Sequence, residues 1–264
     1  MNLLQITTIF LLGLLSCNTP APANIQPNTL IVDNTQSYCG LIEEDDYIVA
    51  SSRRQKQVAT QSRQAAVEVH NDGRGVRGSG TYFIYDGNPI IVTSAHVVEG
   101  PSPIVTITSP SGESVPAMVA YFNLGPSNDY AVLVLAKEMK TRTAMDFEIR
   151  RSYNDIIGES IVYTGFPGAH DQLTLYGNVI GIARNGDLLL HSYAWMGASG
   201  SVIFDDRGRI LGVLKAVDVN RTPTSPFRQV TEDIVWISRF DPKLDKLDKV
   251  LLIMQLIEEL NTGE

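Results

Sequence analysis

The sequence predicts an all-β fold of antiparallel sandwiches or barrels, followed by one C-terminal helix. From about Gln64 onward, short runs that are apolar or alternate in polarity recur at regular intervals, as β-strands do. Segments rich in Gly, Asn, Asp and Pro separate these runs. The 21 glycines and 13 prolines also fit a turn-rich β protein better than a helical one.

The predicted strands divide evenly on either side of about Asp146. The first six are AAVEV at Ala65, TYFIY at Thr81, PIIVTS at Pro89, PIVTITS at Pro103, SVPAMVAYF at Ser114 and DYAVLVLA at Asp129. The second six are ESIVYTG at Glu159, LTLYGNVIGIA at Leu173, LLLHSY at Leu188, SVIF at Ser201, RILGVLKAV at Arg209 and DIVWIS at Asp233. Because no long helical pattern lies between them, a parallel βαβ fold is disfavoured. The predicted boundaries are 64–146 and 147–238.

Residues 239–264 contain the one segment with helical periodicity, PKLDKLDKVLLIMQLIEEL, which starts at Pro242. Apolar residues recur three to four positions apart, and Asp and Lys occupy the other face. The apolar stripe consists of Leu244, Leu247, Val250, Leu251, Ile253, Met254, Ile257 and Leu260. We expect this helix to pack on the body of the protein. A membrane-surface or partner-docking helix is the alternative, although its polar face is mixed in sign rather than basic.

Residues 1–17 have the composition of an export signal. The apolar stretch is short for a bilayer span and has the size of a secretory h-region. It ends in LLSC, which resembles the lipobox of bacterial lipoproteins, and this resemblance implies cleavage and lipidation at Cys17. No Lys or Arg precedes the apolar run, so a plain signal peptide or an uncleaved anchor remains an alternative. Each of these possibilities predicts export, to a bacterial cell envelope or beyond it.

Residues 18–63 begin with NTPAPANIQPN, whose composition cannot bury a core, and a tether is predicted there. Cys39 is the only other cysteine, so a disulfide framework is excluded if Cys17 is lipidated. The net charge of -8 and the lack of a basic cluster argue against nucleic-acid binding. No His, Cys and Asp set has the spacing of metal ligands, and no cofactor is predicted.

Three polar residues stand out in their surroundings. His96 in TSAHVV follows a buried strand, where a lone histidine is usually a packed core residue. Asp129 opens the strand NDYAVLVL, and Ser199 lies between Gly197 and Gly200 in WMGASGSVIFD. A serine hydroxyl becomes a nucleophile when an imidazole removes its proton, and a carboxylate behind the ring fixes its tautomer. The amides of Gly197 and Ser199 are candidates for the donors that stabilise the resulting oxyanion.

The three motifs together resemble the trypsin-like serine peptidases of the chymotrypsin fold, particularly the bacterial branch around HtrA and the glutamyl endopeptidases. The resemblance rests on GSGTYFIYDGNPIIVTSAHVV, NDYAVLVL and GASGSVIFDDRGRILGV, and on YTGFPG at Tyr163. It covers about Gln64 to Ser238 and implies two six-stranded antiparallel β-barrels with the site in the cleft between them. It also implies a His, Asp and Ser triad in the chain order of chymotrypsin. A PDZ module, common in HtrA enzymes, is not expected after Ser238.

The sequence departs from the family pattern at two positions near Ser199. Ala198 and Ser201 stand where the family often has Asn or Asp and Gly, but neither change removes a catalytic atom. The α/β-hydrolase pattern G-x-S-x-G fails at Ser201, and the order Ser, Asp, His fails as well. The resemblance further implies a substrate pocket formed by Tyr193, Leu214, Lys215 and Ala216. Leu214 replaces the histidine of glutamate-specific members, so a medium-sized apolar P1 residue is expected.

These observations predict an exported serine endopeptidase that acts on polypeptides, with a possible membrane tether at Cys17. Ser199 would be the nucleophile, His96 the general base and Asp129 the residue that orients the ring. The rival hypothesis is a binding or scaffold protein of the same fold with an inactive or latent site. In a third alternative, the Val250–Leu260 helix docks a partner and the barrels serve as its platform.

Overall fold

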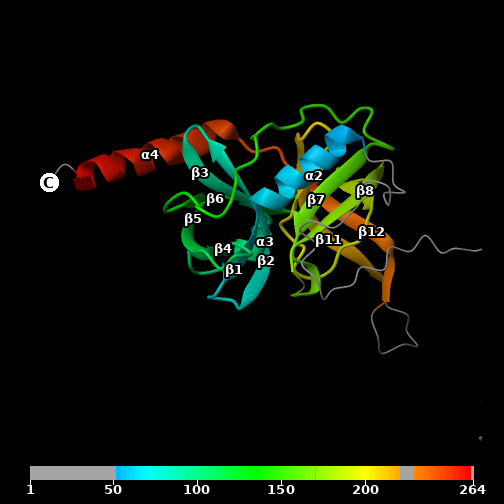
Figure 1. Ribbon diagram of the computed structural model, residues 1–264, viewed down its shortest axis with the longest axis horizontal. Helices are drawn as coiled ribbons and strands as arrows, with labels where there is room; N and C mark the ends of the chain where they lie inside the picture. The colour runs from blue at the N-terminus through cyan, green and yellow to red at the C-terminus, as the bar shows by residue number, and fades with distance from the viewer. Residues whose placement is uncertain (1–51, 170, 221–228, 263–264) are drawn as a thin grey trace, which may run out of the picture. The chain divides into compact units, whose positions relative to one another are not determined.

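The computed structural model describes residues 52–169, 171–220 and 229–262, which form two closed barrels (Figure 1). The first contains β1 (Ala66–Asn71), β2 (Val76–Tyr85), β3 (Asn88–Thr93), β4 (Ile104–Thr108), β5 (Ser114–Gly125) and β6 (Asn128–Leu135). The second contains β7 (Ser160–Gly165), β8 (Leu173–Ile182), β9 (Leu188–His191), β10 (Val202–Asp205), β11 (Ile210–Asn220) and β12 (Gln229–Arg239). The predicted all-β fold of two six-stranded barrels is confirmed. The helices within the described residues are α2 (Arg53–Ala65), α3 (Ala95–Val98), the 3-10 helix η2 (Pro167–Ala169) and α4 (Leu244–Thr262).

Both barrels have the same strand order. In the first barrel the order is β1-β2-β3-β6-β5-β4, and the second repeats it with β7 to β12. All the strand pairs are antiparallel. In this order β3 lies beside β6, although two strands separate them in the sequence. Thr93, the last residue of β3, pairs with Ala131 near the start of β6. This pairing places the segment after β3 next to the first residues of β6.

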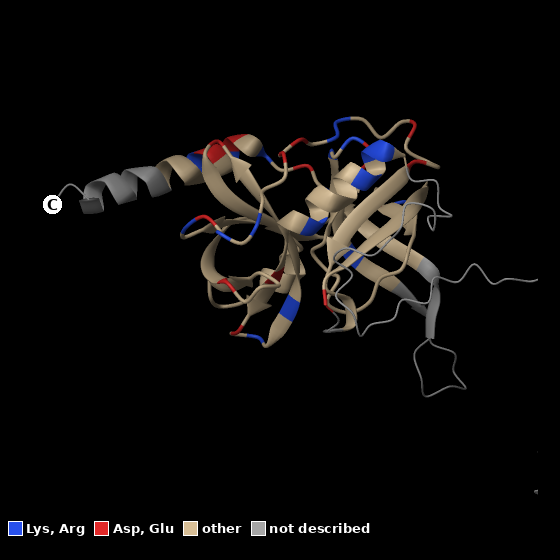
Figure 2. Cartoon of the chain, viewed as in Figure 1, with Lys and Arg blue, Asp and Glu red and all other residues tan. Residues whose placement is uncertain are grey.

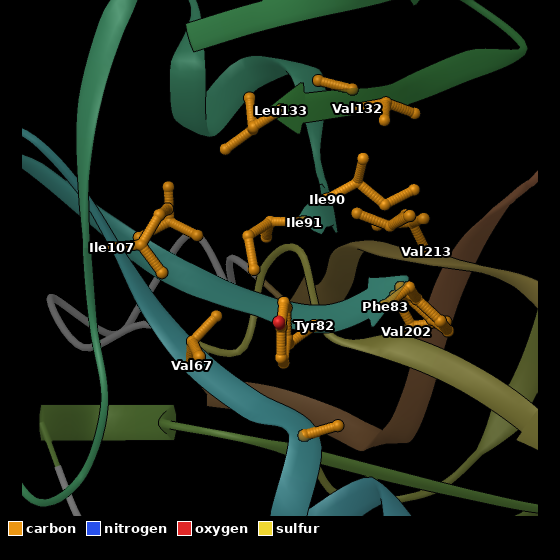
Figure 3. Close-up of a cluster of buried hydrophobic side chains, with 14 of the residues drawn as sticks. Val67, Tyr82, Phe83, Ile90, Ile91, Ile107, Val132, Leu133, Val202 and Val213 are labelled. Carbon is orange, nitrogen blue, oxygen red and sulfur yellow. The ribbon is translucent and has the colours of Figure 1, made fainter. Parts of the chain in front are cut away.

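A continuous apolar cluster joins the two barrels. Successive residues of a strand face opposite sides, and both β10 and β11 contribute buried side chains to each of the two core clusters. Val202 and Val213 pack on first-barrel residues such as Phe83 (Figure 3), whereas Ile203 and Leu211 belong to the core of the second barrel. All of these side chains are fully buried. The contact between the barrels is therefore part of the hydrophobic core, and burial of its apolar surface favours the two-barrel arrangement.

Helix α2 occupies the end of the segment 18–63, for which a tether is predicted, and the rest of that segment up to residue 51 lies outside the described residues. Four basic residues and no acidic residue lie on this helix (Figure 2), and only a few apolar residues mark its inner face. Val58 and Ala59 are buried in the first core cluster, and Ser62 Oγ donates to Thr164 Oγ1 of β7 at 3.0 Å. Ser52 caps the N-terminus by accepting from the Gln55 amide at 3.1 Å. Contacts with distant strands, rather than an amphipathic stripe, stabilise this helix.

Helix α4 begins two residues later than the predicted helical segment and packs on the first barrel. Leu247 and Leu251 are buried in the first core cluster, and Tyr85 donates a 2.7 Å hydrogen bond to Asp248. Burial and this hydrogen bond raise the pKa of Tyr85 to about 12. Leu252 and Ile253 are exposed, and the side chains from Met254 onward lie outside the described part. No helix in the described ranges has the length and apolar content needed to cross a bilayer.

The connection between the barrels is tied to the turn before β5. The Glu113 carboxylate accepts hydrogen bonds from the amides of Lys140 and Thr141 at 3.0 and 2.8 Å. It also accepts from the Thr141 hydroxyl at 2.7 Å. The hydrogen bond from the Lys140 amide, followed by those from Thr141, lowers the pKa of Glu113. The start of the connecting segment is thus fixed by charge-assisted hydrogen bonds.

Candidate active site

His96 and Asp129 meet because β3 and β6 are neighbours. His96 lies in the short helix α3 directly after β3, and Asp129 is the second residue of β6. One carboxylate oxygen, Oδ1, accepts the backbone N–H of His96 at 2.9 Å, and the other, Oδ2, lies 2.6 Å from the ring atom Nδ1. Both carboxylate oxygens of Asp129 are therefore engaged by the same histidine.

The two side chains differ sharply in exposure. The Asp129 side chain is 4% exposed, whereas that of His96 is 35% exposed. A buried carboxylate requires hydrogen-bonding partners, and the contact with Nδ1 favours the neutral tautomer that carries its proton there. The Nε2 atom is then left with a lone pair that can accept a proton. On the second-barrel side, the amide of Asp129 donates to Ser238 Oγ of β12 at 2.8 Å.

The loop that carries Ser199 is clamped to the first barrel through hydrogen bonds that backbone carbonyl oxygens accept. The carbonyl oxygen of Ser199 accepts from the amide of Ser79 in β2 at 2.7 Å. The carbonyl oxygen of Leu214 accepts from the Gly200 amide at 2.9 Å and from the Ser94 hydroxyl at 2.6 Å. Ser94 precedes His96 by two residues. The serine loop and the histidine segment thus share one acceptor, which keeps the two close together.

Gly200 permits this close approach. Its φ of +92° lies in a region that favours glycine. A Cβ added there would lie 2.1 Å from the Ser79 carbonyl oxygen and 2.3 Å from Thr93 Oγ1. No larger residue fits against the end of β3 without displacing the backbone.

The amides of Gly197 and Ser199 differ from the neighbouring amides of the loop in their hydrogen bonding. The Ala198, Gly200 and Ser201 amides donate to the carbonyl oxygens of Trp195, Leu214 and Ala198, respectively. Among the described residues, no backbone carbonyl accepts from the amide of Gly197 or Ser199. Gly197 has a φ of +98°, and a Cβ there would meet the Phe166 carbonyl oxygen at 2.4 Å. Two amides in one turn are thus left available to an anionic oxygen.

The residues expected to form the substrate pocket occupy different environments. Leu214 is 1% exposed and packs in the core of the second barrel, so its carbonyl oxygen rather than its side chain takes part in the clamp. Tyr193 is 44% exposed, and Ala216 is also exposed. Lys215 Nζ donates to Asp187 Oδ2 at 3.0 Å and to the carbonyl oxygen of Pro126 at 2.9 Å. Its ammonium group is therefore engaged at the turn before Asp129.

Sequence reasoning did not identify several residues that organise this region. Ser79, Ser94 and Ser238 each use a hydroxyl to join the two barrels, through Gly197, Leu214 and Asp129, respectively. Asp187 is buried beside Lys215. Only Ser79 had a visible signal, the small-residue stretch GSG in β2. The predictions for Cys17 and Cys39 fall outside the described residues.

The two barrels, the His96–Asp129 pair and the clamped serine loop define the chymotrypsin-like class of proteins. The model of the family described as "Trypsin-like peptidase domain" matches residues 78–213, about half of the chain. The chain belongs to this family.

Solved structures of bacterial proteases resemble this one in fold. The serine endoprotease from Yersinia pestis aligns with a TM-score of 0.54 and 19% identity over 78% of this chain, which spans 66% of that protein. An inactive form of Rv3671c from M. tuberculosis, in which a serine is replaced by alanine, aligns with a TM-score of 0.55 and 17% identity over 80% of this chain and 95% of its own. A comparison with curated protein sequences finds no match.

Proposed function

We propose that this chain is an exported serine endopeptidase that hydrolyses peptide bonds through Ser199, His96 and Asp129. The observation that carries the proposal is the buried Asp129 carboxylate, which holds both the backbone and the ring of a partly exposed His96. Such a carboxylate stabilises the imidazolium that forms when the ring removes a proton from a serine. Family membership and the clamped Ser199 loop support the same conclusion.

In the proposed first half-reaction, Ser199 Oγ bonds to the carbonyl carbon of the scissile peptide, and its proton passes to His96 Nε2. The carbonyl electron pair moves onto oxygen, where the amides of Gly197 and Ser199 stabilise the charge. Collapse of this intermediate breaks the C–N bond, and the leaving amine takes the proton from His96. In the second half, water attacks the acyl-enzyme by the same steps, which releases the acid and restores Ser199.

A second candidate function is a binding or scaffold protein with a latent site. Its support is that, in the described part of the chain, the His96 ring hydrogen-bonds Asp129 without an accompanying hydrogen bond to Ser199 Oγ. Catalytic hydrogen bonds are often long in ligand-free enzymes and tighten when substrate binds. The missing hydrogen bond is therefore compatible with a ligand-free peptidase as well, and covalent labelling separates the two functions.

A fluorophosphonate probe tests the proposal directly. We expect the native protein to be labelled, because the probe phosphonylates a serine activated by a histidine. Mass spectrometry of the digested protein should locate the label on Ser199. Protein heated before addition of the probe and the Ser199→Ala variant serve as blanks. Native protein that stays unlabelled, with its folded circular-dichroism spectrum intact, would favour the scaffold function instead.

We also propose that residues 1–17 direct export and that Cys17 becomes a lipidated N-terminus. The apolar run and the LLSC sequence support this proposal. Mass spectrometry of the mature protein, expressed in a bacterium with lipoprotein processing, should find a diacylglyceryl group on an N-terminal Cys17. A mature N-terminus at another residue would contradict lipidation and leave a plain signal peptide, whereas an intact residue 1 would indicate an uncleaved anchor.

A further inference from the structure

Ser79 contacts three parts of the candidate site from a single position in β2. Its hydroxyl donates to the Gly197 carbonyl oxygen at 2.7 Å and accepts from the Phe166 amide at 3.0 Å. Its backbone amide donates to the Ser199 carbonyl oxygen at 2.7 Å. Its carbonyl oxygen accepts from Thr93 Oγ1, also at 2.7 Å. Ser79 is fully buried, so these partners replace water completely.

The glycines on either side explain why a serine can occupy this position. A Cβ on Gly78 would lie 2.7 Å from a Val97 methyl group and 2.8 Å from the Ser199 carbonyl oxygen. A Cβ on Gly80 would lie 2.7 Å from a methyl group of Ile91. The serine loop can therefore approach β2 closely, and Ser79 supplies a hydroxyl that hydrogen-bonds the loop.

The hydroxyl of Ser79 connects two segments that fix the orientation of the Gly197 amide, namely the serine loop itself and the segment at Phe166. The peptide group between Met196 and Gly197 is held by its carbonyl, which accepts from the Gly168 amide at 2.6 Å. Because carbonyl and N–H point in opposite directions in a trans peptide, this bond directs the Gly197 N–H away from Gly168. Ser79 holds the next carbonyl, that of Gly197, and binds Phe166 in the segment that leads to Gly168. Glycine has access to many backbone conformations, so this orientation needs outside support.

We propose that Ser79 is a positioning residue for the oxyanion-binding amides, acting through the carbonyl oxygen of Gly197. This inference rests on the proposed peptidase function, since the Gly197 and Ser199 amides matter only if an oxyanion forms. It assigns a specific task to the first barrel, which supplies the base and its carboxylate and also holds the donors of the second barrel in place. The hydroxyl acts without touching the substrate.

The Ser79→Ala variant tests this assignment. We expect kcat on a casein-derived peptide to fall by roughly 10- to 100-fold, part of the 10²–10³-fold lost when one oxyanion donor is removed. KM should change by less than about threefold, because the donors act mainly in the transition state. The rate of fluorophosphonate labelling should fall in parallel with kcat. Hydrogen exchange of a peptide covering residues 195–201 should become faster, because the loop loses the donor that holds the Gly197 carbonyl oxygen. A peptide covering Phe166 should also exchange faster, because the Phe166 amide loses its acceptor.

Ser62→Ala is the matched control. It also removes a buried serine hydroxyl that bridges to the second barrel, but its partner is Thr164. We expect a similar loss of thermal stability with unchanged kcat and unchanged exchange of residues 195–201. Ser79→Cys keeps a side chain of similar shape with a weaker donor, so its kcat should lie between those of the parent and of Ser79→Ala. If Ser79→Ala does not fold, the same measurements are made on Ser79→Cys.

Two outcomes would overturn the inference. One is a kcat for Ser79→Ala within about threefold of the parent value, or matched by Ser62→Ala, and the other is unchanged exchange of the loop. A parent protein that neither cleaves nor labels would instead contradict the proposed function. In that case hydrogen exchange still decides whether Ser79 orders the loop.

Discussion

The Asp129→Asn variant is expected to lose about 10⁴-fold in kcat while it keeps its fold. The cause is the tautomer of His96 rather than a loss of contact. Asp129 Oδ1 accepts the backbone N–H of His96 at 2.9 Å, so an asparagine should keep its oxygen on that side. Its NH₂ group then faces Nδ1, which lies 2.6 Å from Oδ2 in the parent protein.

An NH₂ group facing Nδ1 forces that nitrogen to accept a hydrogen bond, and the ring proton moves to Nε2. The base would then present an N–H to Ser199 instead of a lone pair. Because one proton position decides whether the ring can act as a base, a change of a single atom has a large kinetic effect. Binding of the substrate does not involve this proton, so KM should change little.

The kinetic constants of the Asp129→Asn variant, its labelling rate and its thermal unfolding together test this expectation. Asp72→Asn is the matched control, since Asp72 is exposed and its carboxylate accepts a hydrogen bond from Thr106 Oγ1 at 3.3 Å. It makes the same change in charge within the same barrel and should leave kcat unchanged. An Asp129→Asn protein with the parent fold and more than a tenth of the parent kcat would show that the carboxylate does not orient the base.

The strands were predictable from local pattern, whereas the pairing that builds the site was not. The apolar residues of PIIVTS and DYAVLVLA, with the turns beside them, predict a strand in each case. That they become neighbours follows from the strand order of a closed barrel, which no local pattern contains. The resemblance to a known family supplied this step for His96 and Asp129, and in the structure His96 Nδ1 lies 2.6 Å from Asp129 Oδ2.

Helix α2 shows where local pattern is too weak. Its sequence, RRQKQVATQSRQA, is polar on most sides and begins with basic residues, which are unfavourable near a helix N-terminus. Its inner face includes Gln55 and Ser62, whose burial depends on the strands that they touch. A helix that owes its stability to distant partners cannot be distinguished from a linker by its own composition.

Ser79 shows the same limit within the site. Its side-chain partners, Phe166 and Gly197, lie about a hundred residues further along the chain. A serine between two glycines gives no hydrophobic periodicity from which to infer a role. The glycines of the serine loop were easier to interpret, because glycine beside a nucleophile has a direct steric reason. That reason can be tested separately at Gly200.

The Gly200→Ala variant is expected to lose roughly 2–5 kcal/mol of unfolding free energy, from overpacking and backbone strain together. The added methyl group would meet the Ser79 carbonyl oxygen at 2.1 Å and Thr93 Oγ1 at 2.3 Å. These two atoms are hydrogen-bonded to each other in the first barrel, so the serine loop has to move away from β2 and β3. A retreat of about 1 Å is enough to cost about 10²-fold in kcat.

Gly112→Ala separates the two contributions, because Gly112 has a φ of +87° with no atom near the added Cβ. It should lose only the strain, about 1–2 kcal/mol, and keep the parent kcat. Chemical denaturation and peptide hydrolysis measure both variants. If the two lose equal stability and both retain activity, the serine loop does not need close contact with the end of β3. A selective loss at Gly200 would mean that the contact between barrels which stabilises the fold also sets the position of the nucleophile.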